Sequence, residues 1–194
     1  MNEAVARATD ITVRVANDGD VDDLARLYSA ASAELAAMRG GAVLLGLGGR
    51  DGSIARSFST QLGDPAQTVL LAFIPVPPPV TGAGEAARGP DVEADLKLDL
   101  QLDPQLGLAG YGTCVTRELA GGERLGSIEE LYVKPEARRQ GVGHALVASL
   151  TQRCRAAGCT SLDAKALPGS RAVKSFFESE GLTARLLVMH RRLA

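Results

Sequence analysis

Hydrophobic residues in this chain follow two periodicities, and each predicts its own set of secondary-structure elements. Segment 11–16, ITVRVA, alternates and is β-branched, which predicts a strand. The continuous apolar run 68–76, TVLLAFIPV, predicts a strand covered on both faces. Four further segments are expected to be strands: 107–119, 124–135, 160–167 and 183–193.

Apolar residues at helical spacing predict helices between these strands. The first is expected to begin after Asp20, its predicted N-cap, and to end at Gly40-Gly41. Three others are expected at 53–62, 142–157 and 169–180, and the glycine-rich segment 45–52, LGLGGRDG, is expected to be a loop. Helices placed among strands in this order indicate an α/β or α+β fold whose sheet is covered on both faces.

The segment between the second and third predicted strands has a different composition. Residues 75–91 are rich in proline and glycine and predict a mobile loop. Residues 92–102 then alternate strictly, which predicts an edge strand or hairpin, with a strand in a homodimer contact as the alternative. The 194 residues suffice for a single domain spanning 1–194, so we expect 77–106 to be a flexible insertion in it.

Composition and charge narrow the classes of partner. A net charge of -2, from 21 basic and 23 acidic residues, gives no electrostatic reason to expect nucleic acid or a membrane as partner. The first ten residues lack the apolar core of a signal peptide, so a cytoplasmic protein is expected. The three cysteines lack metal-ligand spacing and predict buried or reduced thiols, with no metal site.

The stretch 135–150, PEARRQGVGHALVASL, is the strongest functional signal. A predicted strand ends at Pro135, a basic and glycine-containing turn follows, and a helix begins directly after it. Unpaired N–H groups at a helix start bind anions, and we expect Gly141 and Gly143 to let a phosphate approach closely. A pyrophosphate is therefore expected. A Walker loop would need Lys-Ser/Thr after the glycines, which this chain lacks. A Rossmann fingerprint would need a third glycine, and Leu146 occupies its place. Asp163 lies where the acidic residue of that fingerprint is expected, so the Rossmann alternative stays open.

The pattern Arg/Gln-x-x-Gly-x-Gly/Ala is met by Arg138, Gly141 and Gly143, and here the chain resembles the GNAT superfamily of acetyl-CoA-dependent N-acetyltransferases. Segment 128–147 resembles that family's fourth strand, turn and third helix, and GSRAVKSFFESEGL at 169–182 resembles a later helix. LLVMHRRL at 186–193 resembles the family's last strand.

The resemblance implies a mixed central sheet flanked by helices and splayed between its fourth and fifth strands, where the pantetheine arm of acetyl-CoA would lie. The arm would pair with the backbone of the fourth strand, and the pyrophosphate would lie on the N–H groups of residues 139–144. The implied cofactor-binding residues are Leu131, Tyr132, Val133, Arg138, Arg139, Gln140, Gly141, Val142, Gly143, His144, Ser170 and Phe177.

Acetyl transfer to an amine needs a base near the thioester, and two carboxylates are candidates. Strict alternation would put Glu129 with Ser127 and Leu131 on one face of the strand, and Glu130 with Tyr132 on the other. We expect Glu129 to be the base, with Glu130 as the alternative because a β-bulge would exchange the faces.

The expected activity is acetyl transfer from acetyl-CoA to the primary amine of a small molecule or peptide. Phe177 stands where the family helix often has a tyrosine that protonates the leaving thiolate, so that proton would come from another group or from solvent. The alternatives are a non-catalytic acetyl-CoA-binding or regulatory domain and, third, a nucleotide-binding protein.

Overall fold

A five-stranded mixed sheet forms the centre of the molecule in the computed structural model, which describes residues 11–48, 50, 52–76, 106–186, 188–189 and 191. Its strands are β1 (Thr12–Val15), β2 (Gln67–Pro75), β3 (Leu106–Glu118), β4 (Arg124–Val133) and β5 (Ser161–Ala164), in that spatial order. The first four pair antiparallel, whereas β5 lies parallel to β4. The expected class, a mixed sheet flanked by helices in a single domain, is confirmed.

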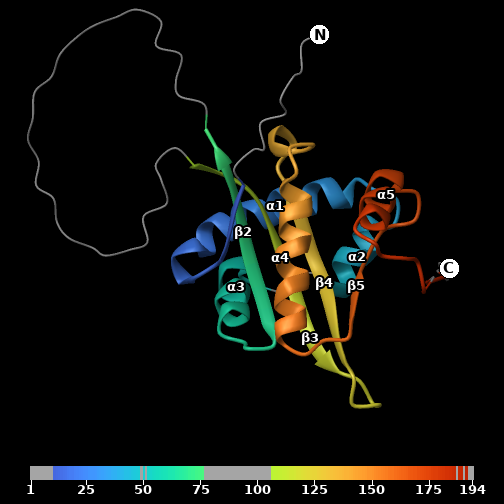
Figure 1. Cartoon of the computed structure of the whole chain (residues 1–194). Helices are drawn as coiled ribbons and strands as arrows, with labels where there is room; N and C mark the ends of the chain where they lie inside the picture. Colours follow the sequence, from blue (N-terminus) through green and yellow to red (C-terminus); the bar gives the residue numbers. More distant parts are fainter. Residues whose placement is uncertain are drawn as a thin grey trace, which may run out of the picture.

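Helices cover both faces of this sheet (Figure 1). In the view of that figure, α4 (Val142–Ala156) lies in front of the strands, and α1 (Val21–Ala36) and α3 (Ile54–Leu62) lie behind them. The remaining elements are α2 (Gly41–Gly48), α5 (Arg171–Ser179) and the short 3-10 helices η1 (Asp18–Asp20) and η2 (Pro135–Ala137). None of the described helices is both long and apolar enough to cross a membrane.

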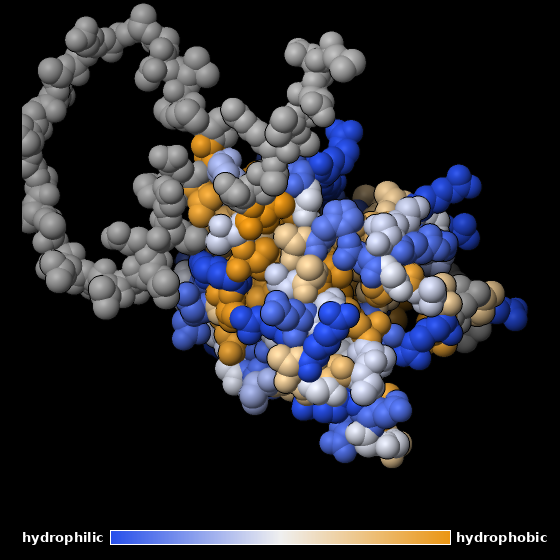
Figure 2. Space-filling view, viewed as in Figure 1, coloured by the Kyte–Doolittle hydropathy of each residue, from blue (hydrophilic) through white to orange (hydrophobic). Residues whose placement is uncertain are grey.

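Two hydrophobic cores follow from this layering. On the α4 side, Leu146, Val147 and Leu150 pack with Ile128 of β4 and Phe177 of α5. On the other side, residues of α1 and α3 pack with Leu71, Tyr111 and Tyr132 of the strands. The hydrophobic run of β2 is buried in both cores, as its continuous apolar sequence predicts. Figure 2 shows hydrophobic side chains on the surface beside α4, over β2.

Two predicted elements differ from the structure. The predicted loop 45–52 is helical through residue 48, because α1 ends at Ala36 and the turn at Met38 and Gly40 starts α2. The predicted last strand at 183–193 is wrong for the described residues, which form no strand there. Leu186, Val188 and Met189 project from this segment and are 83%, 75% and 83% exposed. The predicted strand at 92–102 lies outside the described residues.

Asp20 is the N-cap residue of α1, as predicted, but its side chain does not cap the helix. The Asp20 carboxylate makes no cap bond to α1; it accepts from Asn17 N–H at 2.8 Å and pairs with Arg14 at 2.6 Å. Burial opposes the charged form, but these hydrogen bonds and the Arg14 charge still hold the pKa of Asp20 below its ordinary value. Asp20 thus joins β1 to the start of α1.

The thiols Cys114 and Cys154 lie in the α4-side core with their Sγ atoms 3.2 Å apart. All three cysteines are free, and among the described residues no cluster of His, Cys, Asp and Glu is arranged to hold a metal. The hydrogen bond from Cys114 lowers the pKa of Cys154 to about 7, whereas this bond and burial raise the pKa of Cys114.

Candidate functional site

Strand β4 carries a β-bulge at the first predicted catalytic position. Thr113 of β3 pairs with Glu130, and the next β3 residue, Cys114, pairs with Ile128, so Glu129 is the extra residue. Ile128 and Leu131 consequently both face the α4-side core, although they are three residues apart. The strict alternation expected for this strand is therefore wrong, and the reason is the bulge that the sequence analysis allowed for.

The bulge puts Glu130 on the same side of the sheet as α1 and α3. There its carboxylate accepts from Arg50 Nη2 at 3.0 Å, and the Arg50 side chain is only 7% exposed. Burial first, and then the charge and hydrogen bond of Glu130, raise the pKa of Tyr111 well above its ordinary value. Tyr111 therefore stays a neutral phenol beside this carboxylate.

Glu129 is held by two cations near the surface. Lys165, which follows β5, forms an ion pair with its carboxylate, and Arg117 of β3 donates to it at 3.3 Å. Burial on its own would raise the pKa of Glu129, but hydrogen bonds from Lys165 and Ser127 and the charges of Lys165 and Arg117 lower it. A carboxylate with a lowered pKa is a weaker proton acceptor.

Pairing between β4 and β5 ends partway along β4. The last paired residues are Ile128 and Ala164, so residues 129–133 have no β5 partner. This separation agrees with the splay expected between the fourth and fifth strands. It leaves one edge of β4 unpaired among the described residues, beside the predicted pantetheine-binding residues Leu131, Tyr132 and Val133.

Backbone N–H groups without a partner among the described residues lie at the start of α4. For residues 139–144, no hydrogen-bond acceptor is found among the described residues, and the first bond from this end of the helix is Ala145 N–H to Gly141 C=O at 3.0 Å. Arg139 and Gly141 both have left-handed backbone, with φ of 63° and 90°. Such turns direct successive N–H groups to one side, and the 15-residue helix adds the positive end of its dipole.

The two motif positions, 141 and 143, are occupied by glycine for different physical reasons. Gly141 is required by its positive φ, which residues with a side chain rarely adopt. At Gly143, a Cβ would lie 3.2 Å from two ring atoms of Phe176, so this glycine makes room for α5. The expectation that both glycines serve close phosphate approach is corrected at Gly143, whose missing side chain faces protein.

The motif side chains mostly bind within the fold. Arg138 donates to Val133 C=O at 2.9 Å and to the Glu34 carboxylate of α1 at 2.6 Å, and Glu34 also accepts from the Tyr132 hydroxyl at 3.0 Å. Gln140 Nε2 donates to Glu136 C=O at 2.8 Å. These contacts fix the turn between β4 and α4, so the predicted anion site rests on the backbone N–H groups of the turn and not on these two side chains.

The remaining predicted residues lie around α5. His144 Nδ1 lies in hydrogen-bond contact with the Glu180 carboxylate, and its ring centroid is 5.1 Å from that of Phe176. Ser170 is the N-cap residue of α5, without a capping hydrogen bond from its side chain. Phe177 is buried in the α4-side core.

Sequence reasoning missed Arg50 and the polar residues around it. Arg50 lies in the glycine-rich segment predicted to be a loop, where no periodicity marks a buried side chain. The available signal was on α3, where Ser57 and Gln61 are four residues apart and share one face; both accept from the Arg50 guanidinium, at 3.0 and 2.6 Å.

Comparison with known protein families gives a match to part of this chain. Residues 97–181 match the family model described as acetyltransferase (GNAT) family, which confirms the resemblance found in the sequence. Among curated protein sequences, none matches this chain significantly.

Several solved structures share the fold. A transcriptional regulator from Bacillus halodurans C-125 is 17% identical, with 94% of this chain and 99% of that chain covered and a TM-score of 0.61. Ribosomal-protein-alanine N-acetyltransferase from Brucella melitensis biovar Abortus 2308 is 14% identical, with coverages of 95% and 99% and a TM-score of 0.59. An aminoglycoside acetyltransferase from an uncultured soil metagenomic sample, in complex with sisomicin, is 16% identical, with coverages of 95% and 95% and a TM-score of 0.60. At these identities the likeness is one of fold.

Proposed function

We propose that the chain moves an acetyl group from acetyl-CoA to a primary amine, because its residues 97–181 match the GNAT acetyltransferase family model. The observation that carries the proposal is the set of backbone N–H groups of residues 139–144, which have no acceptor among the described residues. They lie directly after the half of β4 that lacks a β5 partner. A diphosphate on these groups would leave the pantetheine arm free to extend along that edge.

The residues of β4 suit the chemistry of amine acetylation. The amine nitrogen attacks the thioester carbonyl carbon, the carbon–sulfur bond breaks, and the amine proton passes to a carboxylate directly or through water. The bulge supports Glu130 as this base, because it directs Glu130 toward α1 and α3 while Glu129 is neutralised by Lys165 and Arg117. The thiolate takes its proton from solvent, since Phe177 has no hydroxyl and is buried.

The test is incubation of the protein with acetyl-CoA and a panel of small amines and peptides, with free thiol measured over time. Coenzyme A binding is measured in parallel by calorimetry. Thiol release that depends on both the amine and the protein is the expected result. Binding without turnover across the panel would instead favour the second candidate, a regulatory acetyl-CoA-binding domain, to which the buried Phe177 lends support. Competition by ATP would favour a nucleotide-binding protein.

Charge reversal at the α4 turn is expected to weaken cofactor binding. Arg139→Glu replaces a cation by an anion beside the predicted diphosphate site. Over the few ångströms involved, this change is worth about 1.4 kcal/mol, or about a tenfold rise in the Kd for coenzyme A. The difference should shrink at high ionic strength because salt screens exposed charges.

The matched control is Arg153→Glu, at the exposed opposite end of the same helix. It makes the same change in net charge away from the turn, so the Kd should stay within about twofold of wild type. Equal Kd values for wild type and Arg139→Glu at low salt would contradict a diphosphate site at this turn.

A further inference from the structure

Arg50 is a buried cation that reaches β4 from the segment between α2 and α3. Its guanidinium donates to Ser57, Gln61 and Glu130 and lies over the Phe58 ring, 3.5 Å from the ring centroid. Its backbone N–H donates to the Tyr28 hydroxyl at 3.1 Å. The side chain is therefore fixed on several sides and is 7% exposed.

Stability alone explains this ion pair poorly. The free energy needed to remove two charges from water is about as large as the free energy gained from their attraction. A buried ion pair is therefore commonly no more stabilising than apolar residues of similar volume. The partner of Arg50 is Glu130, whose side chain is 20% exposed, so one end of the pair reaches toward solvent while the other is enclosed. This arrangement is suited to presenting a carboxylate at a fixed position.

Unsatisfied polar atoms lie in the same region. Arg50 Nε and Thr113 Oγ1 are buried without a hydrogen-bond partner among the described residues, and Thr113 is the β3 residue that pairs with Glu130. Buried polar atoms normally have partners, so this region keeps hydrogen-bonding capacity beyond what the fold itself uses. A polar group of an acceptor, or a water that relays its proton, is suited to use that capacity.

We infer that Arg50 is a positioning residue for acetyl transfer, which holds the Glu130 carboxylate in a fixed orientation on the α1 and α3 side of β4, where the amine is acetylated. The inference rests on the proposed function. Ser57 and Gln61 orient the guanidinium, the guanidinium orients Glu130, and the neutral Tyr111 hydroxyl supports the same carboxylate. Arg50 itself touches no reacting atom in this scheme.

The test compares Arg50→Met and Arg50→Lys by steady-state kinetics, with kcat expressed per folded molecule. Arg50→Met keeps the length and apolar stem but removes the charge, and kcat is expected to fall at least tenfold. The KM for acetyl-CoA should stay within twofold, because the α4 turn is not in contact with Arg50. Arg50→Lys restores the charge without the planar fork and is expected to recover part of the lost kcat.

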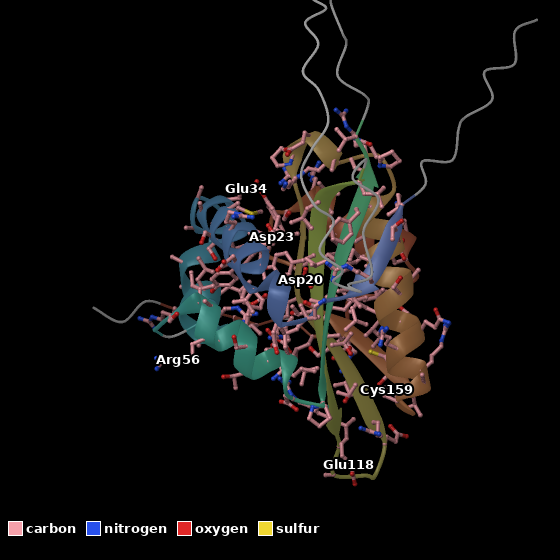
Figure 3. All side chains as sticks on the ribbon, turned by 90° about the vertical axis from the view of Figure 1, so that its left-hand side faces the viewer. Asp20, Asp23, Glu34, Arg56, Glu118 and Cys159 are labelled. Carbon is pink, nitrogen blue, oxygen red and sulfur yellow. The ribbon has the colours of Figure 1, made fainter. Side chains whose placement is uncertain are left out.

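The matched control is Arg56→Met on α3, one residue before Ser57. Arg56 points away from the sheet into solvent (Figure 3), so this variant should match wild type. If Arg50→Met does not fold, Gln61→Met is the second variant. It removes one hydrogen-bond acceptor of the Arg50 guanidinium, so kcat should fall about threefold while the KM for acetyl-CoA stays unchanged.

The outcomes separate the inference from the proposed function. An active wild type together with an unchanged kcat in Arg50→Met, or in Gln61→Met where that variant replaces it, overturns the role of Arg50 alone. A lysine variant no better than the methionine variant assigns the loss to packing and overturns it as well. A wild type that binds coenzyme A but acetylates no amine removes the proposed function and this inference together.

Discussion

Glu130→Gln is expected to lower kcat about 100-fold, the lower end of what a general base contributes. Glutamine keeps the shape of the side chain and still accepts a hydrogen bond from Arg50, but it cannot take the proton of the amine. The KM for acetyl-CoA should change little, because the proposed diphosphate site lies at the other end of the β4–α4 turn. The measurement is steady-state thiol release, corrected for the folded fraction by circular dichroism.

Glu129→Gln is the natural comparison, since it makes the same change one residue earlier. Its carboxylate is paired with Lys165 and Arg117 on the bulge, so kcat is expected to stay within about threefold of wild type. If kcat is instead lower in Glu129→Gln than in Glu130→Gln, Glu129 is the base. The bulge would then not determine which carboxylate accepts the proton of the amine.

Gly110→Ala is expected to lower the free energy of unfolding by about 3 kcal/mol, the upper end for overpacking. A Cβ at this position would lie 2.4 Å from the Tyr132 carbonyl oxygen and 3.1 Å from Val133 Cα. Both are backbone atoms of β4, so no side-chain rotation relieves the clash and the strands must separate. For a chain of this length the midpoint of thermal unfolding should fall by roughly 10 °C.

Gly112→Ala is the control two residues along the same strand. There the closest atoms to a Cβ would be the ends of Leu150 and Leu131, at 3.1 and 3.2 Å, and flexible side chains can shift by a few tenths of an ångström. The expected loss is about 1 kcal/mol or less. Equal melting temperatures for the two variants would show that β3 and β4 tolerate separation behind the candidate site.

The sequence predicted those parts of the fold that local patterns determine. Strand β2 is a continuous apolar run, and α3 and α4 keep their helical spacing, so these elements agree with the structure within a few residues. The turn before α4 was predictable because its glycines, basic residues and following helix occupy consecutive positions. Gly141 in particular has the left-handed backbone that its residue type suggests.

The rest depends on contacts between segments far apart in the sequence. The bulge at Glu129 arises from the register between β3 and β4, which no local pattern records, and it decides which carboxylate faces α1 and α3. Arg50 is 80 residues from Glu130, and its burial depends on Phe58 and Gln61 of a neighbouring helix. The strand predicted at 183–193 was wrong for a similar reason. An alternating pattern favours a strand, but it does not show whether a neighbouring strand is available to pair with it.

The contact between Gly143 and Phe176 has a consequence for engineering. Because the ring of Phe176 fills the space where a side chain at position 143 would begin, the two positions form one design unit. Transplanting Phe176 with α5 into another scaffold would require a glycine at the position that corresponds to 143. A library that diversifies position 143 should therefore carry a smaller residue at position 176. Otherwise the variants recovered will be those that fold despite the contact with Phe176, rather than those with a changed ligand preference.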